Sequence, residues 1–322
     1  MLARVDDHPN RRYFIFKSII LRNLYGVDIM DEAVEICKLR LFLKLAAQVE
    51  PDTRHPNLGI EPLPDIDFNI RAGNSLVGFA TLQSIRDAAE MEQVEPGAVQ
   101  RRLTALGDVD AEVARLEMLG ADLAQACSAF RERQVAGDGS VPPTDKECVQ
   151  DRARRLNDEV NRHLARQYGV DLTKPDVLDR WLASHRPFHW FVDFHAIMAA
   201  GGFAVVIGNP PFVRYPSVDV SYACRGYRTA SCGNLYGLVV ERSLELLRPS
   251  GATSMTVPLS LTFSGDFGNL RTLLLQRGGL LALSSYDNIP DRLFTGAKES
   301  DNTSKANQQR ITVFILLPRK PG

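Results

Sequence analysis

Short apolar runs alternate with amphipathic stretches in the first 80 residues of the chain. Leu24–Ile29 (LYGVDI) is typical of a buried strand, and Asp31–Ala47 repeats apolar residues at the spacing of a helix with one buried face. In Ile66–Ala72 apolar and polar residues alternate, as they do along a half-buried strand. The pattern therefore predicts a strand–helix–strand unit.

The same alternation returns from Phe203 onward. The run FAVVIG at 203–208 predicts a buried strand. The further predicted strands are Thr253–Leu261, Leu280–Tyr286 and Ile311–Leu317, and the predicted helices are Leu235–Leu247 and Phe267–Gln276. Strands that alternate with helices indicate an α/β fold with a mostly parallel sheet.

The region between these parts predicts helices alone. Two apolar stripes at helical spacing, separated by the Gly- and Pro-containing segment 136–145, predict an antiparallel helical hairpin. We expect residues 1–80 and 187–322 to form one α/β fold into which residues 81–186 are inserted. Two roles are open for this hairpin. It is either a solvated hairpin that only buries its apolar face, or it also serves as a DNA clamp or a surface for a partner. The stripes are Val109, Val113, Leu116, Leu123 and Phe130, and Val149, Ala153, Leu156, Val160, Leu164 and Tyr168.

Composition narrows the class of protein. Of 322 residues, 44% are hydrophobic and 24% are charged, and the net charge is −1. From Gly201 onward 13 Lys and Arg stand against 8 Asp and Glu, a charge of +5 that is compatible with nucleic-acid contact. No apolar run reaches the roughly 18 residues of a membrane span. Five scattered cysteines without CxxC spacing suit reduced thiols, so we expect a cytoplasmic protein without a metal site.

The candidate chemistry lies at Asn209-Pro210-Pro211-Phe212, directly after the predicted strand 203–208. Ligands of open α/β sheets bind at the carboxyl ends of strands. Two prolines cannot continue a central strand because each lacks a backbone donor, so the chain must leave the sheet here. Asn209 and the proline carbonyls then offer acceptors, and Phe212 offers a flat apolar face.

This set of groups suits an exocyclic amino group on a purine, whose lone pair is delocalised into the ring. Acceptors on Asn209 Oδ1 and the Pro210 carbonyl, each about 3 Å from the nitrogen, would hold both hydrogens and localise the lone pair for attack on a sulfonium methyl group. Phe212 could stack on a base rotated out of the duplex. Taken alone, the tetrapeptide is equally compatible with an ordinary strand exit and turn.

Other segments occur in an order that strengthens the first interpretation. LYGVDIMDEAVEICKLRLFL, RAGNSLVG, GGFAVVIGNPPFVRY, GNLYGLVVERSLELLRPSGATSMTVPLSL and DNIPDRLF followed by NQQRITVFILL run in this order along the chain. They resemble the motifs of amino-group DNA methyltransferases, in particular adenine-specific enzymes of type II restriction–modification systems. The resemblance covers roughly residues 19–80 and 187–318. Ala204 stands where the family usually has Asp.

The resemblance implies a Rossmann-like methyltransferase sheet that is mostly parallel with an antiparallel last strand, and S-adenosylmethionine as cofactor. Its substrate would be the 6-amino group of an adenine rotated out of double-stranded DNA. Asp28, followed by Ile29, would bind the cofactor ribose, and Asn74 would contact the cofactor adenine. The catalytic residues would be Asn209, Pro210, Pro211 and Phe212, with Phe294 as a second stacking residue beside Phe212.

One motif of that family has no counterpart here. Its Gly-rich turn follows the first strand, but the 23 residues before Leu24 contain no Gly. We expect RRYFIFKSIILR to end a helix, the alternative being a substitute strand at Phe14–Leu21. Without the first strand, two half-sheets keep unpaired edges. The chain would then be a fragment, and a separate chain is a candidate source of the cofactor motif and target-recognition domain.

Two other functions stay open. A protein glutamine methyltransferase also uses Asn-Pro-Pro-aromatic, because a planar amide nitrogen poses the same lone-pair problem. A non-catalytic relic or structural subunit of a DNA methyltransferase would account for the missing Gly-rich turn. A nicotinamide oxidoreductase is disfavoured, because the Gly-x-Gly at 137–139 has no preceding strand.

Overall fold

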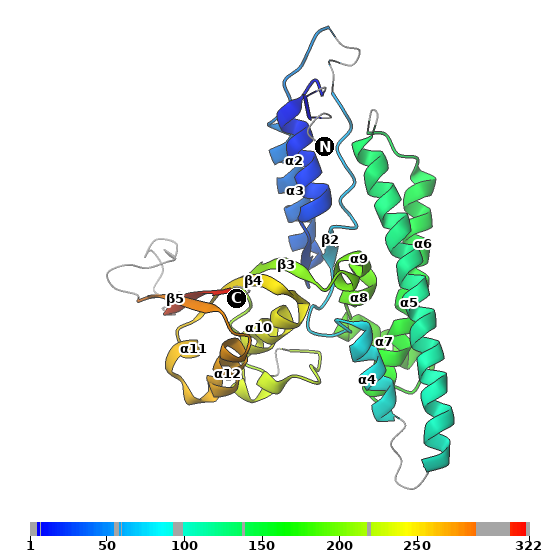
Figure 1. Ribbon diagram of the computed structural model, residues 1–322, viewed down its shortest axis with the longest axis vertical. Helices are drawn as coiled ribbons and strands as arrows, with labels where there is room; N and C mark the ends of the chain where they lie inside the picture. Colours follow the sequence, from blue (N-terminus) through cyan, green and yellow to red (C-terminus); the bar gives the residue numbers. More distant parts are fainter. Residues whose placement is uncertain are drawn as a thin grey trace. The chain divides into compact units, whose positions relative to one another are not determined.

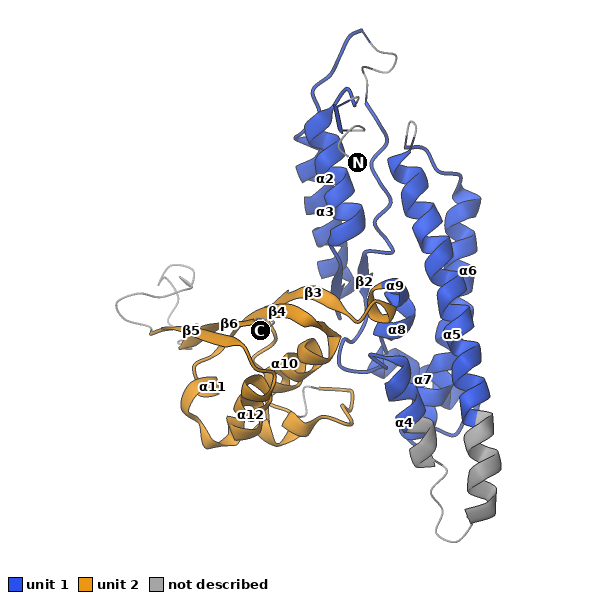
Figure 2. Ribbon diagram, viewed as in Figure 1, with its two compact units in different colours: residues 1–196 blue, residues 197–322 orange. Residues whose placement is uncertain are grey.

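The computed structural model has mixed α/β architecture (Figure 1). It describes residues 5, 6, 8–54, 58, 60–92, 99–136, 139–217, 220–287 and 310–319. The chain divides into two compact units, Met1–Ala196 and Ile197–Gly322 (Figure 2). The predicted division into residues 1–80, 81–186 and 187–322 stays a prediction.

Unit 1 begins with a helix and a small parallel sheet. Helix α2 (Arg11–Asn23) leads into β1 (Gly26–Asp28), and helix α3 (Asp31–Ala46) separates β1 from β2 (Ile70–Ala72). The two strands pair in parallel, with Gly26 opposite Ile70 and Asp28 opposite Ala72. The predicted strand–helix–strand order is therefore confirmed.

The predicted strand Ile66–Ala72 is wrong in its first part. The Ile66 carbonyl accepts hydrogen bonds from Asn69 N (2.9 Å) and Ile70 N (3.0 Å), which closes a turn before β2. The buried Asn69 side chain explains this turn, because its Nδ2 lies 3.0–3.2 Å from the carbonyl oxygens of three residues at the end of α2 and just beyond it. These carbonyls have no partner within a helix, and Asn69 satisfies them only from a turn. They belong to Ile20, Leu21 and Leu24.

The segment Phe14–Leu21 lies inside α2, so the expectation of a helix is confirmed and the substitute strand is wrong. Tyr13, Phe14, Ile20 and Leu21 are buried in a cluster with residues of α3 and β2. An amphipathic helix buries such a stripe on one side, whereas a strand would divide it between two faces.

The remainder of unit 1 is helical. Its elements are α4 (Leu82–Glu92), α5 (Val99–Val135), α6 (Pro143–Gln167), α7 (Pro175–His185) and α8 (Trp190–Asp193), and α9 (His195–Ala199) crosses the division between the units. Helices α5 and α6 pack side by side (Figure 1). Both predicted stripes are buried in them, apart from the half-buried Tyr168 that follows α6, so the helical hairpin is confirmed.

Unit 2 contains a four-stranded sheet in the order β3-β4-β6-β5. Its strands are β3 (Phe203–Gly208), β4 (Leu247–Pro258), β5 (Leu280–Tyr286) and β6 (Ile311–Leu317). Strand β3 is parallel to β4, whereas β6 is antiparallel to both β4 and β5. The antiparallel last strand is thus confirmed. The absence of a first strand stays a prediction.

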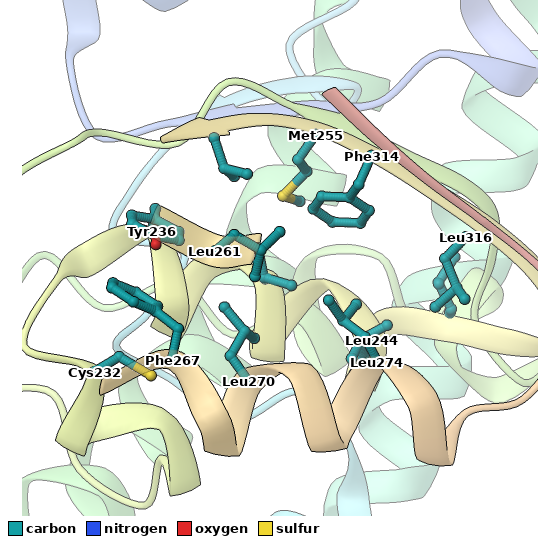
Figure 3. Packing of buried hydrophobic residues seen from close by; sticks show 13 residues of the cluster. Cys232, Tyr236, Leu244, Met255, Leu261, Phe267, Leu270, Leu274, Phe314 and Leu316 are labelled. Atoms are coloured by element: carbon teal, nitrogen blue, oxygen red, sulfur yellow. The ribbon is translucent and has the colours of Figure 1, made fainter. Parts of the chain in front are cut away.

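One face of this sheet, the covered face, carries Met255, Val257, Phe314 and Leu316. Helices α10 (Leu235–Leu246) and α12 (Gly268–Gln276) pack on it (Figure 3). The short elements η2 (Arg228–Cys232), α11 (Ser260–Phe263) and η3 (Gly265–Phe267) close the same layer. The core of the described part of unit 2 lies between this layer and the sheet.

The opposite face of the sheet, the open face, is apolar but exposed. In register, Val205 lies opposite Ala252 and Ile207 opposite Ser254, whose partner on β6 is Ile315. Val205 is 60% exposed and Ile207 76% exposed. The prediction that 203–208 is a buried strand is therefore wrong in its burial, because β4 is its one strand partner among the described residues and only Val206 reaches the core. The open face also includes Leu280 and Leu317.

Among the described residues, no helix combines the length and the apolar character needed to cross a membrane.

Candidate active site at the strand ends

The Asn-Pro-Pro-Phe segment leaves the sheet where the sequence predicts. Strand β3 ends at Gly208, and Asn209 follows it as an exposed residue. Pro210 is buried and Pro211 is exposed. The carboxyl end of β3 lies beside that of its parallel neighbour β4, since Gly208 is paired with Met255. Asn209 is therefore at the sheet edge where α/β proteins bind ligands.

A pocket of about 360 Å³ opens at this edge within unit 2. Phe212 lines it from the segment after β3, and Pro258 lines it from the last residue of β4. The carboxyl ends of two parallel strands thus contribute to one pocket. The other lining residues are Asn234, Leu259, Ser260, Phe263 and Arg310.

The two ends of the segment between Phe212 and α10 are hydrogen-bonded to each other. Leu235 N donates to the Val213 carbonyl at 2.9 Å, and Tyr215 N donates to the Gly233 carbonyl at 3.0 Å. Asn234 then caps α10, its Oδ1 accepting from Tyr236 N at 3.2 Å. These bonds fix Phe212 beside the start of α10.

The buried carboxylate of Glu241 also holds the same segment against α10. Glu241 of α10 is 6% exposed and accepts hydrogen bonds from Arg228 N (3.0 Å), Thr229 N (2.9 Å) and Thr229 Oγ1 (2.7 Å). Bonds to a charged acceptor are stronger than neutral ones. Glu241 therefore ties η2 to α10.

The back of the pocket is continuous with the core. The Ser260 hydroxyl lies 3.0 Å from the Tyr236 hydroxyl, and the Tyr236 ring stacks on Phe267 at a centroid distance of 4.7 Å. Burial raises the pKa of Tyr236, so its hydroxyl stays protonated and can only share hydrogen bonds. Ser260 is thereby held in place at the pocket wall.

The thiols of this region are not activated. Burial raises the pKa of Cys224 to about 11, and burial also raises the pKa of Cys232. A thiol in these surroundings stays protonated near neutral pH, and the thiolate is the nucleophilic form. The side chains that line the pocket therefore offer amide, hydroxyl, guanidinium and aromatic groups, with backbone carbonyls beside them.

The residues predicted to bind the cofactor lie in unit 1, at the carboxyl end of its small sheet. Asp28 ends β1 and is exposed, and Ile29 directly after it is 36% exposed. The Asp28 Oδ1 accepts from Met30 N at 2.8 Å, while its backbone carbonyl accepts from Gly73 N. Asn74 follows Gly73, so the structure brings Asp28 and Asn74 to the same edge.

Asn74 is 3% exposed, and its Oδ1 accepts from Leu76 N at 3.1 Å. Its Nδ2 is buried and makes no hydrogen bond with any described residue. A buried amide donor without a hydrogen bond costs stability. Such a donor is typical of a site where a ligand supplies the missing acceptor. This edge thus combines an exposed acceptor with a buried donor.

The segment 186–190 holds this loop. Asn74 N donates to the Arg186 carbonyl at 2.7 Å, and the Arg186 guanidinium binds the Asp31 carboxylate at the start of α3 at 2.7 and 2.8 Å. Gly78 has φ +136, and a Cβ there would lie 2.1 Å from the Phe188 carbonyl oxygen. Only glycine allows this close approach.

Sequence reasoning missed several residues of the pocket. Asn234, Arg310 and the neighbouring residues Ser260 and Phe263 come from three distant parts of the chain, and sequence reasoning gave none of them a role. The N-cap at Asn234, just before an apolar helix, was the one available signal. Phe294 lies outside the described residues. Among the described residues, no group of three or more His, Cys, Asp or Glu could hold a metal ion.

Comparisons with known proteins place these observations in context. Residues 22–289 match the family of the Eco57I restriction-modification methylases. The chain is 28% identical over 309 residues to the "Putative type II restriction enzyme and methyltransferase RM.MjaORFECS2P" of Methanocaldococcus jannaschii. The match covers 87% of this chain and 25% of that relative, so the chain spans about a quarter of the relative's length.

Proposed function

Because the chain belongs to the Eco57I restriction-modification methylase family, we propose that it is the catalytic part of a DNA adenine methyltransferase. Its substrate is the 6-amino group of an adenine extruded from double-stranded DNA, and it acts in a restriction–modification or related defence system. The observation that carries the proposal is the exposed Asn209 at the carboxyl end of β3, followed by Phe212 in the wall of a pocket.

Asn209 and Pro210 hold the amino group. An acceptor on Asn209 Oδ1 and one on the Pro210 carbonyl take the two hydrogens and draw the nitrogen out of conjugation with the ring. Phe212 stacks on the extruded base, because the reaction cannot reach a base within the duplex. No strong base is needed at the nitrogen, which agrees with a pocket lined by no His, Asp or Glu among the described residues.

The cofactor edge of unit 1 fits a nucleoside. S-adenosylmethionine, when bound, supplies the methyl group as a sulfonium. The exposed Asp28 carboxylate can accept hydrogen bonds from the two ribose hydroxyls, and the buried Asn74 Nδ2 can donate to an adenine nitrogen. Ile29, partly exposed after Asp28, offers an apolar contact to the adenine ring.

The substrate partner is double-stranded DNA, in keeping with the charge of +5 from Gly201 onward. Such an enzyme also needs a Gly-rich turn that binds the cofactor and a surface that recognises the target sequence. A separate polypeptide is a candidate source of both.

The test measures transfer of a radioactive methyl group from S-adenosylmethionine to plasmid DNA, followed by nucleoside analysis of the product. We expect N6-methyladenine from the wild-type chain together with the polypeptide that supplies the Gly-rich turn, and a loss on the order of 100-fold or more when Asn209→Ala replaces the wild-type chain in the same mixture. Asn269→Ala is the control, since Asn269 is an exposed asparagine of the same unit that does not line the pocket.

Three outcomes would contradict the proposal. Methylation that survives Asn209→Ala removes Asn209 from the reaction. Methylation of a Gln-containing peptide in place of DNA identifies a protein glutamine methyltransferase. No product and no calorimetric heat with S-adenosylmethionine, even after addition of an upstream polypeptide, identifies a non-catalytic relic.

A further inference from the structure

We infer that Phe263 is a further aromatic contact for the extruded base, in the same pocket as Phe212 and distinct from the expected stacking residue Phe294. This inference rests on the proposed function and adds a residue that the sequence motifs do not indicate. Phe263 is the last residue of the four-residue helix α11 and lines the pocket together with Phe212.

The exposure of Phe263 is unusual for its surroundings. Its side chain is 70% exposed, whereas Leu261, two residues earlier on the same helix, is 2% exposed and belongs to the core. Leaving a phenyl ring in water forgoes the stabilisation that its burial would provide. A ring held at a pocket wall in this state recovers that stabilisation when a flat apolar ligand covers it.

The backbone beneath Phe263 is held firmly. Arg271 Nη1 donates to the carbonyls of Leu261 (3.0 Å) and Ser264 (2.8 Å), on both sides of Phe263. Thr262 Oγ1 donates to the Leu259 carbonyl at 2.8 Å, and Leu259 N donates to the Arg310 carbonyl at 2.9 Å. The ring is therefore presented by an ordered turn, which lowers the entropy lost when a ligand binds.

The remaining lining suits one nucleotide. A volume of about 360 Å³ is near the lower end of the range of about 300 to 1,000 Å³ for ligand pockets. Pro258 and Leu259 are apolar, while the Asn234 amide and the Ser260 hydroxyl can bond to a base edge. Arg310, whose Nε binds Asp287 Oδ1 at 3.0 Å, adds a cation beside the pocket for an adjacent phosphate.

The binding test uses short single-stranded DNA that carries 2-aminopurine in place of one adenine, with randomised flanking bases. The base needs no extrusion there, so its binding is measured apart from the cost of unstacking. Stacking on a protein ring quenches the fluorescence of 2-aminopurine. We expect quenching with the wild-type chain, and a dissociation constant raised on the order of 10-fold or more in Phe263→Ala and Phe263→Leu.

Phe263→Leu separates a stacking ring from mere apolar contact, because leucine keeps the hydrophobic character without the flat face. Phe263→Trp should restore binding to within about 3-fold of wild type, since every base stacks on an aromatic ring. Leu275→Ala is the control, because Leu275 is 66% exposed on α12 and does not line the pocket. Thermal unfolding of all four variants should match that of the wild type.

The methylation assay is run on the same variants. We expect kcat/KM on plasmid DNA to fall on the order of 10-fold or more in Phe263→Ala and Phe263→Leu, and to recover in Phe263→Trp. Unchanged quenching and unchanged kcat/KM in Phe263→Ala would overturn the inference while leaving the role of Asn209 intact. Wild-type chain that fails to quench 2-aminopurine would overturn it as well. Quenching that depends on Phe263 without any methylation would instead contradict the proposed function and leave base binding standing.

Discussion

The two faces of the four-stranded sheet in unit 2 have similar composition and opposite surroundings. The covered face buries Met255, Val257 and Phe314 against α10 and α12, each at 3% exposure or less. On the open face, Val205 and Ile207 are at least 60% exposed, although their strand β3 has the apolar sequence FAVVIG. The same β-strand alternation thus produces a core on one side and an exposed apolar surface on the other.

The difference teaches where the stability of the candidate site comes from. The pocket residues are connected to the covered face through Ser260 and Tyr236, and through the turn that Arg271 holds. Asn209 instead follows β3, an edge strand that pairs only with β4 among the described residues. Asn209 therefore depends less on the buried core than the other pocket residues do. An exposed apolar surface of this kind marks either an interaction surface or a tendency to aggregate.

The largest effect should come from the covered face. Phe314→Ala removes a fully buried ring from the inner strand β6, and it should lower the free energy of unfolding by about 3 to 5 kcal/mol. Hydrogen exchange of peptides from β4 and β6 reports this locally. Ile207→Thr, which keeps a β-branched side chain on the open face, should change the same quantity by less than about 0.5 kcal/mol. Equal losses in the two variants would show that the open face is covered in solution.

A smaller effect should come from the entry to β3. Gly202 has φ +110, and a Cβ there would lie 2.4 Å from the Leu246 carbonyl oxygen. Gly202→Ala should therefore cost about 1 to 3 kcal/mol, measured by the same exchange experiment on β3 and β4. Gly201→Ala is matched to it, because Gly201 has φ +94 but nothing within 4 Å of its Cβ position. The difference between the two variants isolates the close approach, and identical losses would argue against it.

The smallest effect on stability, with a clear optical signal, should come from the open face itself. The double variant Ile207→Thr and Ile315→Thr places threonines on β3 and β6, on either side of Ser254 of β4. We expect its binding of the dye ANS to fall while the free energy of unfolding changes by less than about 1 kcal/mol. Unchanged dye fluorescence would show that ANS binds elsewhere and not to the open face.

The sequence by itself determined much of the local structure. Apolar periodicity located β5, β6 and the helical hairpin, because a strand and a helix repeat their buried positions at different spacings. It also placed Asn209 just beyond the end of β3, because two prolines cannot donate to a sheet. Local rules of this kind need only neighbouring residues.

Only the tertiary structure decided which surfaces are buried and which residues meet. Asn69 closes a turn where alternation predicted a strand, because its side chain satisfies carbonyls some 45 to 49 positions earlier. Strand 203–208 is apolar enough for a buried strand, yet burial depends on what packs against it rather than on its own sequence. Phe263 and Arg310 join Phe212 in one pocket although 46 residues separate the first two. Such contacts depend on the pairing of whole strands, which no short window of sequence contains.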